Sequence, residues 1–111
     1  MKLIVAIVQD EDSGRLVSAL MDNGFRVTKL ATTGGFLRAG NTTLISGVED
    51  DQLDNALGII EKICKSREQI TASAAPMGST AAGGVYVPYP IRVTVGGATV
   101  FVLEVSQFLK V

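Results

Sequence analysis

The chain has 111 residues, of which 47% are hydrophobic and 19% charged, and its formal net charge at pH 7 is -1. A chain of this length forms one domain, and its balanced charge gives no positive field with which to attract duplex nucleic acid or an anionic membrane. The sequence has no His and one Cys, which excludes a Ser-His or Cys-His nucleophile, an internal disulfide and a thiolate zinc cluster.

The first half of the chain is expected to form a strand, a helix and two further strands. Residues 3–8 are an unbroken β-branched run, typical of a strand buried on both faces. The acidic residues 10–12 are expected to cap a helix that ends near Gly24, although binding of Mg²⁺ by these carboxylates stays open. Strands are expected over residues 25–32 and 42–48, joined by a Gly-rich connection.

The second half is expected to contain a helix, a long loop and two strands. Apolar residues at helical spacing predict an amphipathic helix over residues 53–64. Residues 68–85 are dominated by small and turn-forming residues, which predicts a long flexible loop. Residues 86–95 and 98–105 are expected to pair as a hairpin across the Gly96-Gly97 turn.

The resulting order, β-α-β-β-α-β-β, predicts a single α+β domain over residues 1–111. Its first six elements follow the ferredoxin-like plan, in which two helices cover one face of an antiparallel sheet, and the last strand is an extra one. The other sheet face would remain apolar, and oligomerisation is the simplest way to bury it. Acidic residues follow the first apolar run at once, and no apolar run approaches a membrane span, so we expect a cytoplasmic protein without membrane insertion.

The segment over residues 26–41 is the richest in binding chemistry. It combines three cations, several hydroxyls, three glycines, an aromatic ring and an amide. Arg26 suits a phosphate, Phe36 offers a face on which a base can stack, and Asn41 can pair with an adenine edge. These residue types predict a nucleotide site, while composition alone leaves open an ordinary Gly-rich hairpin with solvated charges.

The block from Lys29 to Thr43 resembles the signature of the PII-like cyclic di-AMP receptor family; it reads Lys29-Leu-Ala-Thr-Thr-Gly-Gly-Phe-Leu-Arg-Ala-Gly-Asn-Thr-Thr43. Shorter stretches at residues 4–10, 76–78, 88–90 and 95–101 share the resemblance, which thus covers almost the whole chain. It implies a homotrimer of ferredoxin-like subunits that binds cyclic di-AMP in clefts between neighbouring subunits. Such a protein relays the signal through loop rearrangement to a protein partner, without catalysis, cofactor or metal.

Carried over by position, the resemblance implies a set of ligand contacts. One adenine is expected beside Phe36, with phosphate or ribose held near Arg26. The full set is Arg26, Val27, Thr28, Gly35, Phe36, Leu37, Asn41, Gly47 and Phe101. The resemblance also implies a polar residue, often Gln, over the ligand near the C-terminus. Here the last residues, 108–111, read Phe-Leu-Lys-Val, and Lys110 is the group expected to approach a phosphate.

Three other functions are alternatives to a cyclic di-AMP receptor. Nitrogen-regulatory PII proteins carry their long loop after the second strand, whereas here it follows the second helix, which argues against sensing of ATP and 2-oxoglutarate. A trimeric scaffold similar to metal-tolerance proteins has no need for the Gly-Gly-Phe at residues 34–36. An acylphosphatase-like enzyme would hold phosphate and water with Arg and Asn, but the glycine-rich signature of that family, ending in Phe-Arg, is missing here.

Overall fold

The computed structural model describes residues 1–30, 40–73 and 89–111. The elements follow one another as β1 (Lys2–Gln9), α1 (Asp10–Asp22), β2 (Thr28–Lys29), β3 (Asn41–Val48), the short 3-10 helix η1 (Asp50–Gln52), α2 (Leu53–Cys64), β4 (Arg67–Ser73), β5 (Tyr89–Val95) and β6 (Ala98–Glu104).

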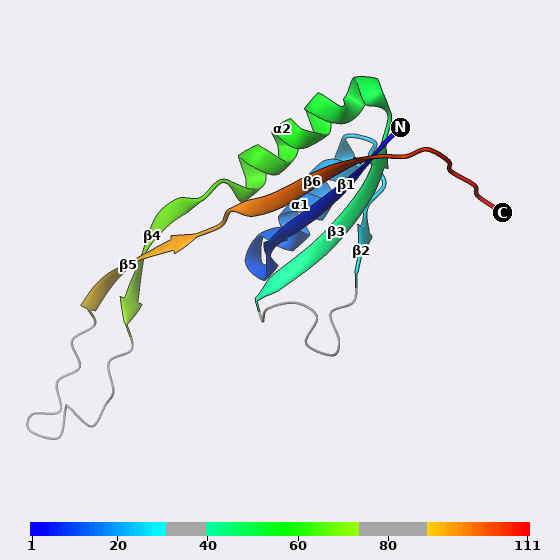
Figure 1. Ribbon diagram of the computed structural model, residues 1–111. Coiled ribbons are helices and arrows are strands. Elements are labelled where there is room, and N and C mark those ends of the chain that lie inside the picture. Colours follow the sequence, from blue (N-terminus) through cyan, green and yellow to red (C-terminus); the bar gives the residue numbers. More distant parts are fainter. Residues whose placement is uncertain (31–39, 74–88) are drawn as a thin grey trace, which may run out of the picture.

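Four strands form an antiparallel sheet in the order β2-β3-β1-β6, and both helices pack on one of its faces (Figure 1). The central strand β1 pairs on one side with β3, from Lys2↔Val48 to Gln9↔Asn41, and on the other with β6. This order is compatible with the ferredoxin-like plan, with β6 as its fourth strand. The α+β prediction is confirmed, but the additional strands lie between α2 and β6 rather than at the C-terminus.

The additional strands β4 and β5 form a separate two-stranded antiparallel sheet, here called the arm, which extends away from the body (Figure 1). Two predictions are therefore wrong. Residues 67–73 form a strand instead of the start of a loop, and residues 74–85 of that predicted loop lie outside the described residues. The predicted hairpin also fails, because β5 pairs with β4 and β6 pairs with β1.

The Gly96-Gly97 bend explains why the expected hairpin does not form. Both glycines have positive φ, +85° and +90°. The backbone N–H of Gly96 donates to Oε1 of Gln9, and that of Gly97 donates to the carbonyl of Cys64. The bend is thus fastened to the body, and the chain passes from the arm into the main sheet instead of folding back on β5.

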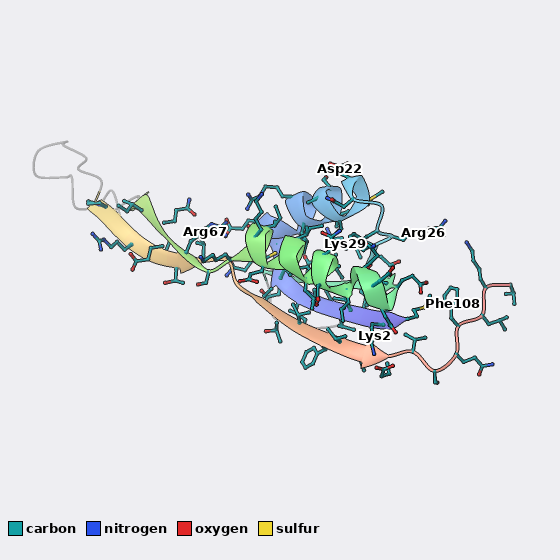
Figure 2. All side chains as sticks on the ribbon, turned by 90° about the horizontal axis from the view of Figure 1, so that it is seen from above. Lys2, Asp22, Arg26, Lys29, Arg67 and Phe108 are labelled. Atoms are coloured by element: carbon teal, nitrogen blue, oxygen red, sulfur yellow. The ribbon has the colours of Figure 1, made fainter. Side chains whose placement is uncertain are left out.

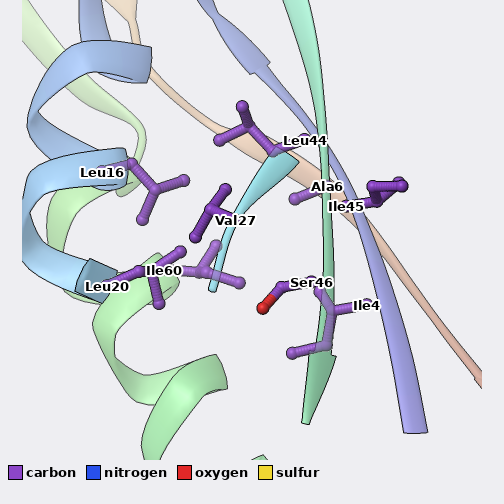
Figure 3. A pocket seen from close by; sticks show the side chains of 9 residues that line it. All are labelled: Ile4, Ala6, Leu16, Leu20, Val27, Leu44, Ile45, Ser46 and Ile60. Carbon is purple, nitrogen blue, oxygen red and sulfur yellow. The ribbon is translucent and has the colours of Figure 1, made fainter. Parts of the chain in front are cut away.

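The hydrophobic core lies between the helices and the sheet. Figure 3 shows Leu16 and Leu20 of α1 and Ile60 of α2 beside Ile4 and Leu44 of the sheet. The cavity among them measures about 10 Å³, room for one water at most. The predicted apolar stripe of the second helix is confirmed, because Ala56, Ile60 and Cys64 are buried.

The opposite face of the sheet is open. Alternate residues of β1 point to this face and are only half-buried, so the prediction of a strand buried on both faces is wrong for a single chain. On β6, Phe101 is paired with Val5 and Leu103 with Leu3, and the side chains of Phe101 and Leu103 are 53% and 47% exposed. An antiparallel sheet with helices on one side only leaves such a face uncovered.

The start of α1 also differs from expectation. Its N-cap residue, Gln9, forms no side-chain capping hydrogen bond, and Asp10, Glu11 and Asp12 lie in the first turn. Asp10 accepts a hydrogen bond from Thr42, and Asp12 pairs with Arg15 and Arg67. The carboxylates of Asp10 and Asp12 therefore bind distant parts of the chain rather than capping the helix. None of the helices in the described ranges has the length and apolar character to cross a membrane.

Candidate functional site

The turn after α1 places Arg26 and Thr28 on the open face. The chain leaves the helix through Gly24, at φ +86°, and the buried Phe25 anchors it to the body. From there side chains alternate, as expected for an extended segment. The Oγ of Ser46 donates to the carbonyl of Arg26 at 2.6 Å, and Thr28 stands opposite Ile45 of β3. Contacts with β3, one from a side chain and one from strand pairing, thus fix both residues.

A groove of about 450 Å³ lies on the open face next to these residues. It is lined by Met1, Leu3, Arg26, Thr28, Ile45, Gly47, Val105 and Phe108. Figure 2 shows Arg26 and Phe108 at the end of the body away from the arm. The volume falls in the range of small-molecule sites, and three of the predicted contacts, Arg26, Thr28 and Gly47, come together in it.

The chemistry of the groove is amphipathic. Five apolar side chains form most of its lining, whereas Arg26 contributes a permanent cation and Thr28 a hydroxyl. Gly47 has no side chain, so the backbone of β3 is accessible there. Such a lining can hold a planar apolar group against the sheet and an anionic group beside the guanidinium.

Three other predicted contacts are placed elsewhere. The side chain of Val27 packs against the hydrophobic core, so only its backbone faces outward. Asn41 lies six residues before Gly47 on the same strand, a separation of about 20 Å at the rise of a β-strand. Phe101 shares the open face with the groove but lies on β6, on the far side of β1 from β3.

Gly35, Phe36 and Leu37 lie outside the described residues. The described residues on either side of this segment are held at the Asn41 end of β3. The N–H of Leu30 donates to the carbonyl of Thr43 at 2.9 Å, and the N–H of Asp10 donates to the carbonyl of Gly40 at 2.8 Å. Among the described residues, the predicted contacts therefore separate into the groove group, which is Arg26, Thr28 and Gly47, and Asn41 at the other end of β3.

Several lining residues are absent from the predicted contacts. Leu3 and Ile45 belong to the groove because Leu3 is opposite Gly47 and Ile45 is opposite Thr28. Strand pairing of that kind is the signal that would have identified them. Phe108 rather than Lys110 lines the groove, and Gln107, next to Phe108, is the residue type that the resemblance implies near the C-terminus.

The candidate metal ligands do not assemble in the described part of the chain, where no three His, Cys, Asp or Glu side chains gather. The carboxylate of Asp12 is instead paired with arginines. The hydrogen bond from Arg67 lowers the pKa of Asp12, and this outweighs the effect of its burial, which raises that pKa. Burial, together with the charge of Asp12, raises the pKa of the Cys64 thiol to about 11.

Comparisons with known proteins agree with this architecture. The crystal structure of a functionally unknown protein from Pediococcus pentosaceus ATCC 25745 is 44% identical to this chain, covers 99% of this chain and 96% of its own, and superposes with a TM-score of 0.76. A family model described as cyclic-di-AMP receptor matches residues 1–111. This match confirms the resemblance found in the sequence, and because it spans the whole chain, the protein belongs to the cyclic-di-AMP receptor family.

Proposed function

We propose that the protein is a non-enzymatic, PII-like receptor of the cytoplasm that binds cyclic di-AMP between the subunits of a homotrimer and relays binding to a protein partner. One observation carries the proposal: a groove of about 450 Å³ joins Arg26, Thr28 and Gly47 to an apolar floor, in a chain of the cyclic-di-AMP receptor family.

The groove suits one half of such a ligand. Cyclic di-AMP carries two adenines and two phosphodiesters. An adenine can lie on the apolar floor near Ile45 and Phe108, where stacking on an aromatic ring is worth about 1–3 kcal/mol. A phosphodiester then comes within reach of the Arg26 guanidinium, which binds phosphate through two parallel hydrogen bonds.

The division of the predicted contacts supports a site shared by two subunits. Asn41 lies about 20 Å along β3 from Gly47, so these two residues of one chain lie too far apart to hold the same adenine. The open face beside the groove exposes Phe101 and Leu103, which a neighbouring subunit would bury. We infer that the groove group of one subunit and the Asn41 end of β3 of the next enclose the ligand together.

The proposal is tested by titration calorimetry of the protein with cyclic di-AMP. Arg26→Ala is expected to weaken binding about 10- to 100-fold, because a charge-assisted contact to phosphate is lost. Lys29→Ala is the matched control. It removes a nearby cation from β2, at a position opposite the buried Leu44 on the helix side of the sheet. Its affinity should therefore stay within about threefold of wild type. Absence of binding heat with the wild-type protein would contradict the proposal.

The same titration tests the contacts implied by the resemblance. Phe36→Ala and Asn41→Ala are expected to weaken binding while light scattering still shows a trimer. Wild-type affinity in both variants would remove these residues from the site. The ligand should be recovered intact after incubation, whereas hydrolysis of cyclic di-AMP or of an acyl phosphate would favour an enzyme.

A further inference from the structure

The first strand of the arm is fastened to the N-terminal turn of α1. Arg67, the first residue of β4, donates from one guanidinium nitrogen to Oδ1 of Asp12 at 3.0 Å and from another to the carbonyl of Lys65 at 3.1 Å. The side chain of Asp12 is only 1% exposed. Figure 2 shows Arg67 at the junction between arm and body. A buried carboxylate with a charged partner resists separation from it.

The second strand of the arm is fastened to the same place. The N–H of Gly96, which follows β5, donates to Oε1 of Gln9 at 2.7 Å, and the N–H of Gly97 donates to the carbonyl of Cys64. Packing here is close: a Cβ on Gly96 would stand 2.6 Å from both the Arg67 guanidinium and the Lys65 carbonyl. Both strands of the arm therefore meet the body at residues 9–12.

Residues 9–12 also hold the Asn41 end of β3. The N–H of Asp10 donates to the carbonyl of Gly40 at 2.8 Å, and its carboxylate accepts a hydrogen bond from Thr42. Gln9 is in register with Asn41. One short segment thus contacts the arm on one side and a part of the candidate ligand site on the other.

In residues 1–30, 40–73 and 89–111, the side-chain and turn hydrogen bonds that join the arm to the body are those given above. The arm is a two-stranded sheet, a form that is marginal on its own in water, and Ile70 in its first strand is 66% exposed. Within the described part of the chain, Asp12 Oδ2 has no hydrogen-bond partner, while Oδ1 serves both Arg15 and Arg67. The cluster of Asp12, Arg15 and Arg67 therefore has a second carboxylate oxygen, to which the guanidinium of Arg67 can move.

We propose that residues 9–12 couple the candidate ligand site to the arm, with Arg67 and Asp12 as the positioning residues of this coupling. A shift of Gly40–Thr42 is passed through Asp10 to the first turn of α1, and from there through Asp12 and Gln9 to both strands of the arm. The identity of the ligand rests on the proposed function, whereas the coupling itself rests on the contacts described above. Coupling of this kind is reciprocal, so a change at the arm must also alter the stability of the hydrogen bonds at Asp10.

The coupling is tested first without ligand, by amide hydrogen exchange resolved by NMR. Arg67→Ala should accelerate exchange of the Gly96 amide and, at a distance, that of the Asp10 amide bonded to Gly40, each by at least about threefold. Arg15→Ala removes an arginine from the same carboxylate oxygen without touching the arm, and Arg92→Ala removes an arginine from the arm without touching Asp12. Neither control should accelerate exchange at Asp10. An unchanged Asp10 amide in Arg67→Ala would overturn the proposal.

The second measurement adds cyclic di-AMP. In the wild type, binding should alter exchange of the arm amides, and Arg67→Ala should bind with an affinity within about threefold of wild type but lose this response. Arg67→Lys, which keeps the charge but not the planar fork, should restore part of it. An arm response in Arg67→Ala equal to that of the wild type would overturn the coupling. If the wild type shows no binding heat, the proposed function fails instead, and the ligand-free measurement still decides the coupling.

Discussion

At the scale of single residues, Gly47 is a position where a substitution would put a side chain into the groove without straining the backbone. Its φ is not positive, and an added Cβ would meet only the sulfur of Met1, at 4.0 Å. A larger side chain there would occupy space at the lining of the groove. The absence of a side chain at this position is therefore a feature of the site rather than of the fold.

We expect Gly47→Val to weaken cyclic di-AMP binding by at least about tenfold, because its branched side chain takes up space that the ligand needs. Gly47→Ala, with a single methyl group, should have a smaller effect. Calorimetry gives the affinities, and thermal unfolding checks that both variants keep the wild-type fold. Equal affinity of Gly47→Val and the wild type would place the ligand away from this groove.

Cys64 is a core residue rather than a reactive thiol. It is buried at the end of α2, and burial raises the pKa of its thiol to about 11. At pH 8 only about one thiol in a thousand would then be ionised, and only the thiolate reacts rapidly. We expect alkylation by iodoacetamide at pH 8 to be at least about a hundredfold slower in the native protein than in urea. Equal rates in the two states would show that Cys64 is accessible.

At the scale of elements, the arm depends on an ion cluster for its attachment to α1. The hydrogen bond from Arg67 lowers the pKa of Asp12 below its ordinary value. A carboxylate whose pKa is lower in the folded than in the unfolded protein stabilises the fold at any pH above its unfolded-state pKa, which is about 3.9 for Asp. This contribution to the free energy of unfolding is lost as the pH falls through the folded-state pKa. The attachment should therefore hold at neutral pH and fail in acid.

We predict that Asp12→Asn lowers the free energy of unfolding by about 1–2 kcal/mol at pH 7, because two charge-assisted hydrogen bonds are weakened. The difference from the wild type should shrink as the pH falls through the lowered pKa of Asp12, because a protonated Asp12 no longer offers its arginines a charge. Urea unfolding at a series of pH values measures it. A difference that does not change with pH would show that the charge of Asp12 contributes no stability.

At the scale of the whole molecule, the open sheet face exposes apolar side chains that a single chain does not cover. Phe101 and Leu103 are about half exposed on it, and the residues after β6 expose Phe108, Leu109 and Val111. Apolar surface of this kind on a small domain marks an interface. It is a physical reason to expect an oligomer, and the resemblance implies that this oligomer is a trimer.

We expect the wild-type protein to be a trimer by light scattering at micromolar concentration, and Phe101→Asp to shift it toward monomer by placing a charge in the interface. Ile70→Asp is the matched control, because Ile70 is an exposed apolar residue of the arm, at 66% compared with 53% for Phe101, and lies away from that face. A monomeric wild type, or equal effects of the two variants, would contradict an interface on the open face.

The sequence by itself determined the elements whose signal is local. The apolar spacing of α2, the β-branched run of β1 and the Gly24 stop after α1 each depend on residues within one or two turns of chain. The alternation that sends Arg26 and Thr28 to one face and Val27 to the other is equally local. The block from Lys29 to Thr43 carries the resemblance, because its residue order is far more specific than its composition, and the family model that matches residues 1–111 agrees with it.

Only the tertiary structure decided which strands pair and which residues share the groove. The Gly96-Gly97 pair has the local signal of a hairpin turn, yet hydrogen bonds to Gln9 and Cys64, far away in sequence, direct β5 to β4 and β6 to β1. The acidic first turn of α1 has the local signal of a cap, yet Arg67 and Thr42 take its carboxylates. Leu3, Ile45 and Phe108 join Arg26 because strand register and the course of the C-terminal segment bring them together. Such long-range pairings are settled by the summed contacts of the whole fold, and no local pattern records them.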